Sequence, residues 1–338
     1  MSGGEDIGLR AAVPGGSPRV VAVVLTHRRP RLAGDVVRSL LGDEGLAPRQ
    51  VIVVVNGVGG LDDPDLESAV RTIRLPHNLG PAGGFAAGMA AAFADRSVRW
   101  AYLCEDDVGL FALPRGRLAG VVERAERAQG TPPEPADAVL GAVVAYGRRF
   151  VGRGAHTENV VPPPVDPDDL VPVDVASWGA TLVSRAVFDA GIVPDPSWFF
   201  GLEDFDFFCR VGRAGFAVMV DGRSARAVAD QQTSAGRQAT LRGRRPTDAD
   251  EVWRSYYHAR NSVEFARRYG DPSWQWWNAA YAARHLQLAS GWAERRAIAH
   301  GLWDGARRRR GEHPAYGRTL DEGPSAGGPP VGTEPPPG

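Results

Sequence analysis

Short apolar runs alternate with amphipathic segments along the first part of the chain. Val20 to Thr26 and Val51 to Val55 are β-branched runs without charges, a pattern typical of strands buried on both faces. Between them, residues 32–41 carry apolar side chains at helical spacing, and Gly42 closes the segment. Asp63-Pro64 then provides the cap and first residue of a second helix. This order predicts an α/β fold with a parallel sheet.

The alternation continues toward the middle of the chain. Strands are predicted over 72–75, 99–104 and 138–145, with extended structure over 173–183. Helices are predicted over the Ala-rich segment that ends near Asp95, over 118–128 and over 204–213. The Pro/Asp-rich stretch 160–172 is typical of a loop. We therefore expect one α/β domain over residues 19–250, followed by a helical, Trp-rich subdomain over residues 251–310.

Composition narrows the class of protein. Residues 1–18 and 311–338 are rich in Gly and Pro and poor in apolar side chains, so both ends are predicted to be disordered. The net charge of -1 gives no general attraction to nucleic acid, and none is expected as a partner. Only Cys104 and Cys209 are present, which argues against a disulfide framework. The N-terminus lacks a signal-peptide pattern, and these features favour a cytoplasmic protein.

One predicted strand ends in three consecutive carboxylates, Glu105-Asp106-Asp107. Like charges in a small space raise each other's pKa, so such a cluster favours a divalent metal or a polyphosphate bound to one. A solvated acidic turn is the alternative. Ligands of open α/β sheets collect outside the carboxyl ends of the strands, so Thr26, Asn56 and Asn78 are expected to rim one crevice with these acids.

A glycine-rich segment, Asn78 to Phe85, precedes the Ala-rich helix. Glycines at a helix N-terminus let backbone N–H groups approach phosphate, and the helix dipole favours the anion. Close packing of the helix on the sheet is the alternative explanation. Neither Gly57-Val58-Gly59 nor Gly80 to Gly84 fits a dinucleotide fingerprint, so hydride transfer is disfavoured. A phosphate cradle beside a carboxylate-held metal predicts a nucleoside diphosphate site.

Taken together, these motifs resemble family 2 inverting glycosyltransferases of the GT-A fold, especially the bacterial rhamnosyl- and galactofuranosyltransferases. The likeness spans roughly residues 19–265. It rests on Val20 to Thr26 with His27-Arg28-Arg29-Pro30, Asn56-Gly57, Asn78 to Phe85, Glu105 to Asp107, Trp198 to Arg210, and Tyr256 to Asn261. The resemblance implies a Rossmann-like, mostly parallel sheet flanked by helices, with a C-terminal helical extension.

The resemblance also implies an activity. A sugar would move from a nucleoside-diphosphate sugar, UDP- or dTDP-linked, to a hydroxyl of a saccharide, a lipid-linked saccharide or a small molecule, with Mg²⁺ or Mn²⁺ as cofactor. Asp204 matches the catalytic base, and Glu105 and Asp107 match the metal ligands. For Asp204 the alternative is an acid that satisfies the helix dipole.

Further roles are carried over from the same resemblance. The positions that would bind the nucleotide-sugar donor are Thr26, Arg28, Asn56, Asn78, Gly80, Gly83, Gly84 and Asp106. The positions that would form a wall shared by donor sugar and acceptor are Trp178, Gly179, Trp198 and Glu203. For the two tryptophans, burial in the core is the alternative.

The chain departs from the family's pattern at three points. Glu105 stands where members usually have Asp, and Val55 replaces an Asp that commonly contacts the nucleobase. A histidine expected after the last strand is absent from 228–234, where only Asp230 and Gln231 could substitute. These departures leave open a non-catalytic nucleotide-sugar binder or assembly partner. A nucleotidyltransferase is less favoured, because it would require a Gly-rich loop after the first strand and a lysine, which this chain lacks.

The C-terminal Trp and Arg residues, which end in Arg307 to Arg310, allow two interpretations. They could form an interfacial helix against anionic lipid on the inner face of the plasma membrane. A packed helical subdomain with a solvated basic end would have the same composition. A homo-oligomer also remains open.

Overall fold

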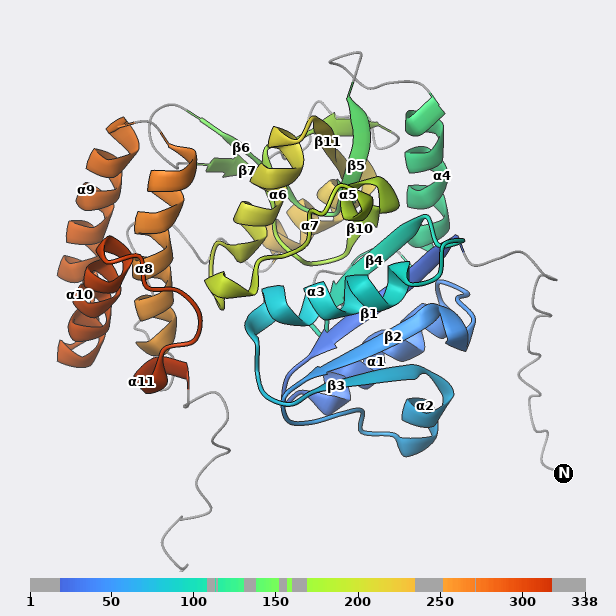
Figure 1. Ribbon diagram of the computed structural model, residues 1–338. Coiled ribbons are helices and arrows are strands. Elements are labelled where there is room, and N and C mark those ends of the chain that lie inside the picture. Colours follow the sequence, from blue (N-terminus) through green and yellow to red (C-terminus); the bar gives the residue numbers. More distant parts are fainter. Residues whose placement is uncertain are drawn as a thin grey trace, which may run out of the picture.

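The computed structural model describes residues 19–107, 113, 115–130, 138–151, 157–159, 169–234, 252–270 and 272–317. An eight-stranded sheet with the order β3-β2-β1-β4-β10-β5-β11-β8 forms its centre, and helices lie on both faces (Figure 1). A group of C-terminal helices lies at one side of the sheet, next to α6 (Glu203–Arg213). Within the sheet, β8 (Leu170–Pro172) and β10 (Thr181–Ser184) run antiparallel to their neighbours. This architecture confirms the predicted class, a mostly parallel sheet flanked by helices with a C-terminal helical region.

The first half of the sheet follows the predicted order. Its four parallel strands are β1 (Val20–Thr26), β2 (Val51–Asn56), β3 (Arg71–Leu75) and β4 (Trp100–Glu105). The segments that connect them are α1 (Pro30–Gly42), η1 (Pro48–Gln50), α2 (Pro64–Ala69) and α3 (Gly80–Phe93). The side chain of Asp63 accepts from the backbone N–H groups of Asp65 and Leu66, which confirms it as the cap of α2.

The second half differs more from the pattern. Its strands are β5 (Val139–Val144), β6 (Gly147–Phe150), β7 (Thr157–Asn159), β9 (Val175–Ala176) and β11 (Phe216–Asp221), beside β8 and β10. Its helices are α4 (Arg117–Gly130), α5 (Arg185–Asp189), η3 (Pro196–Trp198) and α7 (Gly222–Ser234), beside α6. The segment 160–172 was predicted as a loop, but its last residues form β8 because they pair with β11. The extended segment 173–183 divides into β9, in a three-stranded sheet, and β10, in the main sheet.

Each face of the main sheet has its own apolar core. On one face, alternate residues of β1 such as Val23 pack with Phe85 of α3 and Phe207 of α6. On the other face, the intervening residues such as Val24 pack with Val37 of α1 and with α4. This alternation explains why the strands read as uninterrupted apolar runs, since both faces are covered.

Two glycines let α3 approach the sheet. A Cβ on Gly84 would lie 2.2 Å from Leu25 Cδ1, and a Cβ on Gly88 would lie 2.2 Å from Val23 Cγ1. Neither strand residue can move freely in the core, so larger side chains would push the helix away. Gly84 therefore has the packing role that was the alternative to a phosphate contact.

The C-terminal region consists of α8 (Val252–Tyr269), α9 (Pro272–Leu288), α10 (Trp292–Ala306) and α11 (Pro314–Gly317). The helices α8, α9 and α10 lie side by side in Figure 1. Residues 311–317, predicted to belong to a disordered tail, instead pack on α8, since the N–H of His313 donates to the Tyr257 hydroxyl at 2.9 Å. Residues 1–18 and 318–338 lie outside the described residues. Among the described helices, none combines the length and the apolar character that a membrane crossing needs.

Candidate active site

The carboxyl ends of the parallel strands meet at one edge of the sheet. Thr26 Oγ1, at the end of β1, donates to Asp106 Oδ2 at 2.9 Å, just after β4. His27 Nδ1 and the carbonyl of Asn56, at the end of β2, lie 2.7 Å apart. The Asn56 amide in turn donates to Asn78 Oδ1 at 2.9 Å. The predicted convergence of these strand ends is confirmed.

Asn56 and Asn78 are both buried, and their amides hold the start of α3. Asn56 Nδ2 also donates to the carbonyl of Gly80 at 3.0 Å, and Asn56 Oδ1 accepts from the N–H of Leu79 at 2.8 Å. Asn78 Oδ1 accepts from the N–H of Gly80 at 2.9 Å. These bonds fix the loop before α3, and contact of either side chain with a nucleotide stays a prediction.

The glycine-rich start of α3 packs against the segment that leads to α6. Gly80 has a φ of +72°, and a Cβ there would lie 1.8 Å from the carbonyl oxygen of Phe199. A Cβ on Gly83 would lie 2.4 Å from Leu79 Cβ and 3.5 Å from Pro196 Cβ. Two motifs more than a hundred residues apart in sequence are thus in direct contact, and only glycine fits at position 80.

Arg29 binds two of the three acids at the end of β4. Its Nη2 lies 2.7 Å from Asp106 Oδ1, and its Nη1 lies 3.0 Å from Asp107 Oδ2. Asp106 is buried, and burial raises the pKa of its carboxyl, against the effect of Arg29 and Thr26. Arg29, which was not among the predicted site residues, is thus a cation paired with this cluster, and the predicted contact of Arg28 with the donor stays a prediction. The motif His27-Arg28-Arg29-Pro30 contained the signal, but nothing in the pattern separates two adjacent arginines.

Glu105 links the two acidic motifs. Burial, together with the charges of Asp107, Asp204 and Asp106, raises the pKa of its carboxyl to about 8, while Arg29 opposes the shift. Asp204 belongs to α6, so its effect on Glu105 means that the start of α6 faces the end of β4. The two acidic clusters are therefore brought together in one site.

The acids of α6 differ in their surroundings. Glu203 is buried, and its pKa is raised well above the ordinary value by burial and by the charges of Asp204 and Glu105. Burial raises the pKa of Asp204 to about 6, while the N–H of Phe205, which donates to Asp204 Oδ1 at 2.8 Å, and the Ser177 hydroxyl oppose the shift. Ser177, which sequence reasoning missed, directly precedes Trp178.

The arrangement of Glu105 and Asp107 fits a divalent cation. Asp107 Oδ1 is a buried atom without a hydrogen-bond partner among the described residues. A cation between the two carboxylates would relieve the repulsion that raises the pKa of Glu105. Within the described part of the chain, Glu105 and Asp107 belong to no group of three His, Cys, Asp or Glu side chains whose ligand atoms all lie within 4.8 Å of one another. The side chains of Asp230 and Gln231 lie outside the described residues.

The two tryptophans of the expected sugar-binding wall are core residues. Trp178 is 2% exposed, and its ring centroid lies 5.0 Å from that of Phe85 and 5.3 Å from that of Phe207. Trp198 is also buried and makes an edge contact with Phe265 at 6.3 Å. Gly179 is partly exposed in the turn between β9 and β10. This burial favours the core interpretation for both indoles, and sugar binding at Gly179 stays a prediction.

The backbone that leads into α6 adopts an uncommon conformation. Phe199 has φ 61° and ψ -64°, and the N–H of Phe200 donates to the carbonyl of Trp198 at 2.8 Å, which defines a γ-turn. Leu202, the cap of α6, also has a positive φ of 66°. Non-glycine residues in such regions cost free energy and persist only when the surroundings hold them.

The helix α8 supplies those surroundings. Asn261 Nδ2 lies within hydrogen-bond distance of three carbonyl oxygens, at 3.0 Å from Trp198, 2.7 Å from Phe200 and 2.7 Å from Gly201. Arg260 Nη2 donates to the Trp198 carbonyl at 2.7 Å. Both side chains are buried. The tract Tyr256 to Asn261, recognised only as part of a resemblance, thus fixes the loop that precedes Glu203-Asp204.

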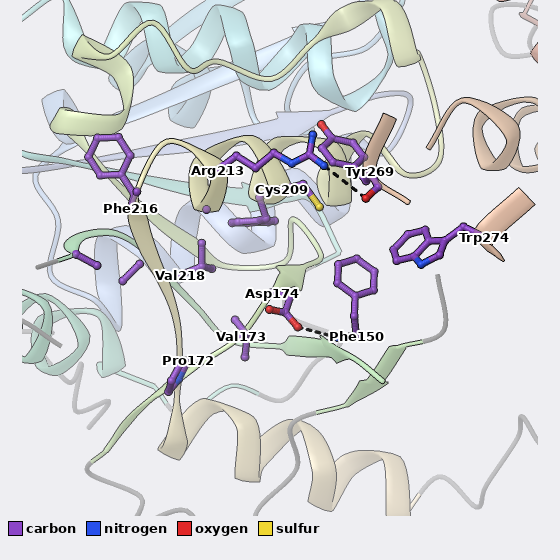
Figure 2. Close-up of a pocket in the computed structure, with 15 residues that line it drawn as sticks. Phe150, Pro172, Val173, Asp174, Cys209, Arg213, Phe216, Val218, Tyr269 and Trp274 are labelled. Atoms are coloured by element: carbon purple, nitrogen blue, oxygen red, sulfur yellow. Dashed lines mark hydrogen bonds between the residues drawn. The ribbon is translucent and has the colours of Figure 1, made fainter. Parts of the chain in front are cut away.

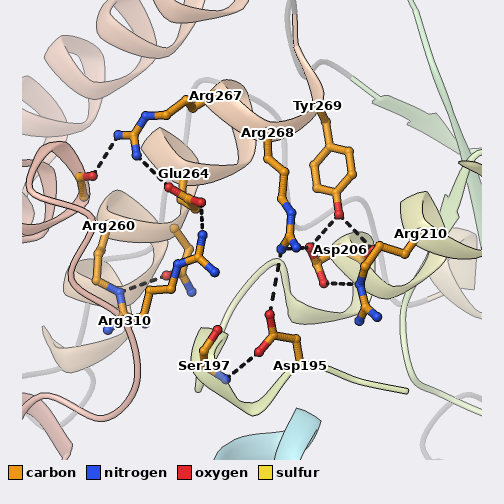
Figure 3. Close-up of polar contacts among 12 residues, drawn as sticks. Asp195, Ser197, Asp206, Arg210, Arg260, Glu264, Arg267, Arg268, Tyr269 and Arg310 are labelled. Carbon is orange, nitrogen blue, oxygen red and sulfur yellow. Dashed lines mark hydrogen bonds and ion pairs between the residues drawn. The ribbon is translucent and has the colours of Figure 1, made fainter. Parts of the chain in front are cut away.

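A second attachment joins α8 to the first turn of α6. Asp206 is fully buried, and its carboxylate accepts from Arg210 Nε at 2.9 Å, from Arg268 Nη1 at 2.8 Å and from the Tyr269 hydroxyl (Figure 3). Glu203 and Asp204 therefore lie between two segments that α8 contacts, residues 198–201 on one side and Asp206 on the other. The helix α8 therefore helps to position the segment that carries both acids.

Replacing Asn261 by Ala tests this support. The change removes the amide that donates to the carbonyls of residues 198–201, so we expect the free energy of unfolding to fall by about 2–4 kcal/mol. Urea denaturation measures it. Ser262→Ala is the control, since the Ser262 hydroxyl bonds only within its own helix, to the Ala259 carbonyl at 2.9 Å, and should cost about 0.5 kcal/mol or less. Equal losses in both variants would contradict the assignment.

The raised pKa of Glu105 predicts a pH dependence of stability. Between about pH 4.5 and 8, the folded state holds a proton that the unfolded state releases, so metal-free stability should fall as pH rises through this window. Glu105→Gln should reduce the fall by about 1–3 kcal/mol, leaving the part due to Glu203 and Asp204. Added Mn²⁺ should restore stability at the alkaline end. Glu123→Gln, on the exposed face of α4, should leave the profile unchanged.

A cavity of ≈ 450 Å³ lies elsewhere, between the small sheet, α6 and the C-terminal helices (Figure 2). Its lining includes Phe150, Cys209, Tyr269 and Trp274, and none of the predicted site residues. Asp174, at its wall, accepts from the N–H of Phe150 at 2.8 Å. Because none of the acids at the end of β4 or the start of α6 lines the cavity, it does not compete with the end of β4 as the chemical centre.

No protein family and no curated protein matches the sequence. Many solved structures are similar in part, and three of them are described. The mannosyltransferase PcManGT from Pyrobaculum calidifontis, with GDP-Man and Mn²⁺, is 14% identical, with 90% of each chain covered and a TM-score of 0.37. GalNAc-T7, with UDP, GalNAc and Mn²⁺, is 10% identical, with 86% of this chain and 58% of its own chain covered and a TM-score of 0.44. S. aureus TarS, residues 1–349, is 10% identical, with 86% of this chain and 92% of the TarS chain covered and a TM-score of 0.41. Such scores do not establish a shared activity, so function has to be inferred from the site.

Proposed function

We propose that the chain is a metal-dependent, inverting glycosyltransferase of the GT-A type. It would move a rhamnose- or galactofuranose-like sugar from a nucleoside-diphosphate sugar to a hydroxyl of a saccharide or glycolipid. The observation that carries the proposal is the approach of Asp204 to Glu105, two acids almost a hundred residues apart in sequence whose charges interact in one partly buried site. One acidic group for a cation and another for a proton are what such a transfer requires.

Asp204 is the proposed base. Its pKa of about 6 leaves it ionised at neutral pH and still able to accept a proton from an acceptor hydroxyl in the transition state. The Ser177 hydroxyl and the Phe205 N–H orient the carboxylate. Attack from the side of Asp204 on the anomeric carbon, opposite the diphosphate, inverts the configuration in a single displacement.

Glu105 and Asp107 are the proposed ligands of Mg²⁺ or Mn²⁺. The ion, when bound, neutralises the charge that develops on the leaving diphosphate. Arg29 pairs with Asp106 and Asp107, so it keeps the carboxylates oriented and offsets their repulsion. Burial and the charges of Asp204 and Glu105 raise the pKa of Glu203, which in its protonated form can donate a hydrogen bond to a sugar hydroxyl.

The exposed aromatic side chains of the C-terminal helices support a lipid-linked acceptor. Trp276 on α9 is 80% exposed and Trp292 on α10 is 79% exposed, and Arg307 to Arg310 follow α10. Indoles and arginines of this kind favour the surface of an anionic membrane, here the inner face of the plasma membrane. Co-sedimentation with anionic but not with zwitterionic vesicles would support peripheral contact.

Turnover of nucleotide sugars tests the proposal. Purified chain with Mn²⁺ or Mg²⁺ is incubated with a panel of UDP-, dTDP- and GDP-sugars and a saccharide acceptor, and release of the nucleoside diphosphate is measured. Release that depends on the metal and on Asp204 supports a transferase. Binding of one donor without any turnover would instead favour the second candidate, a non-catalytic nucleotide-sugar binder, which the substitution of Glu for Asp at position 105 motivates.

A further inference from the structure

A second group of metal-ligand side chains lies in the C-terminal region, outside the acidic site. His300 and Asp304 are one turn apart on α10, and His313 directly precedes α11. One ligand atom from each of the three lies within 4.8 Å of the other two. The set combines two imidazoles with one carboxylate, unlike the oxygen-only acids at the end of β4.

The distances within this group fit a shared ion better than direct hydrogen bonds. His300 Nε2 lies 3.6 Å from Asp304 Oδ2, and His313 Nε2 lies 3.7 Å from the same oxygen. Hydrogen bonds to oxygen are shorter, at about 2.7–3.2 Å. Two ligands of a tetrahedral zinc ion, each about 2.0–2.1 Å from the metal, are about 3.4 Å apart. A small contraction would therefore bring the three side chains to coordinating distance.

Neighbouring groups hold these side chains in place. The Tyr256 hydroxyl of α8 donates to Asp304 Oδ2 at 2.8 Å, the kind of outer contact that orients a metal-binding carboxylate. Without metal, the N–H of Ala315 donates to His313 Nδ1 at 3.1 Å, so the ring proton lies on Nε2, which faces Asp304 Oδ2. Asp304 is 0% exposed, whereas His300 is partly open to solvent. A buried carboxylate beside an open imidazole leaves room for water at one position.

We propose that His300, Asp304 and His313 form a zinc-type metal site, with two imidazole ligands, one carboxylate ligand and a water. Imidazole ligands favour zinc and similar transition metals over Mg²⁺, which prefers oxygen. Binding through His313 Nε2 places the ring proton on Nδ1, so the Ala315 N–H exchanges this partner for water. Arg309, whose Nη1 lies 3.5 Å from Asp304 Oδ1, is a competing cation on the exposed side.

The position of the site gives it a structural role. It joins α10 to residues 307–317, and that segment also contacts the loop before α6, since the N–H of Gly311 donates to the Ser197 carbonyl at 2.6 Å. Arg260, which holds the same loop, also donates to the Gly311 carbonyl. A bound ion would fasten this segment to the helix bundle and would take no part in sugar transfer.

Zinc titration of the full chain, freed of any polyhistidine tag and of metal, tests the proposal. Excess Mg²⁺ in all samples occupies oxygen-only sites such as Glu105 and Asp107. We expect one equivalent of Zn²⁺ to bind and to raise the melting temperature, and Co²⁺ to give the visible spectrum of a tetrahedral site. His300→Ala and His313→Ala should each weaken binding by more than the about 10–100-fold of outer-shell changes.

Two further variants sharpen the result. Arg309→Ala should tighten zinc binding, because it removes a competing positive charge and leaves the ligands intact. His285→Ala, on α9, should leave binding unchanged. Zinc uptake by the double variant His300→Ala/His313→Ala equal to that of the parent chain would overturn the proposal, as would a parent chain that binds no zinc under these conditions. Both readouts are independent of glycosyl transfer, so they also separate this site from the proposed function.

Discussion

Asp204→Asn is expected to lower turnover by about 10²–10⁴-fold while donor affinity changes little. The amide has the same shape as the carboxylate but cannot accept the proton of the acceptor hydroxyl. In the parent chain, kcat/KM should rise as pH increases through about 6, where Asp204 loses its proton, and then level off. The variant should lack this rising limb. Initial rates of nucleoside diphosphate release across the pH range, together with donor titration, measure both effects.

Asp189→Asn provides the matched control. Asp189 lies at the end of α5, is largely exposed and pairs only weakly with Arg185 at 3.9 Å. The same chemical change there should leave turnover and its pH profile unaltered. If Asp204→Asn kept full turnover, the base would have to be another group, and Glu203 would be the next residue to replace.

Asp107→Asn is expected to remove most of the metal-dependent part of donor binding. A neutral amide is a poorer ligand for a hard divalent cation than a carboxylate, and Asp107 Oδ1 is buried without a hydrogen-bond partner among the described residues. The loss of one charge also leaves Arg29 with Asp106 alone. Binding of a nucleoside diphosphate is measured by calorimetric titration with and without Mn²⁺. The gain in affinity that Mn²⁺ gives should be at least tenfold larger in the parent chain than in the variant.

Two further variants help to interpret the result for Asp107: Glu105→Gln tests the second proposed ligand, and an exposed aspartate serves as the control. If Glu105 coordinates the ion directly, Glu105→Gln should weaken metal-dependent binding to a similar degree. A smaller effect would place Glu105 behind the ligand shell. Asp35→Asn, on the exposed face of α1, should not affect binding. Unchanged metal dependence in Asp107→Asn would rule out this carboxylate as a ligand.

The first half of the fold could be predicted because strands that are buried on both faces consist of uninterrupted apolar residues. Runs such as Val20 to Thr26 and Val51 to Val55 can only be interior strands, and the glycines and prolines between them mark the turns. The strands β8 and β11 were not predicted, because β8 has only three residues and the first residues of β11 are partly exposed. Their pairing depends on contacts distant in sequence, which a local pattern does not contain.

The acids of the site were predictable, but their supports were not. Three carboxylates at a strand end need compensation wherever they lie, so Glu105 to Asp107 stand out without a structure. That Arg29 pairs with Asp106 and Asp107 depends on the turn at His27 to Pro30, which the sequence pattern does not describe. Likewise, Asn261 looks like any helical amide until its three backbone partners are seen. The burial of Trp178 also depends on packing that spacing does not reveal.

The γ-turn at Phe199 has a consequence for synthesis of the chain. Its strained backbone is held by Asn261 and Arg260, about sixty residues further on, and Arg260 also donates to the carbonyl of Gly311. While the ribosome is still translating α8, the chain can already form the sheet but cannot yet lock the proposed base in place. A nascent chain would therefore stay inert toward nucleotide sugars until nearly all of its helices have emerged from the exit tunnel.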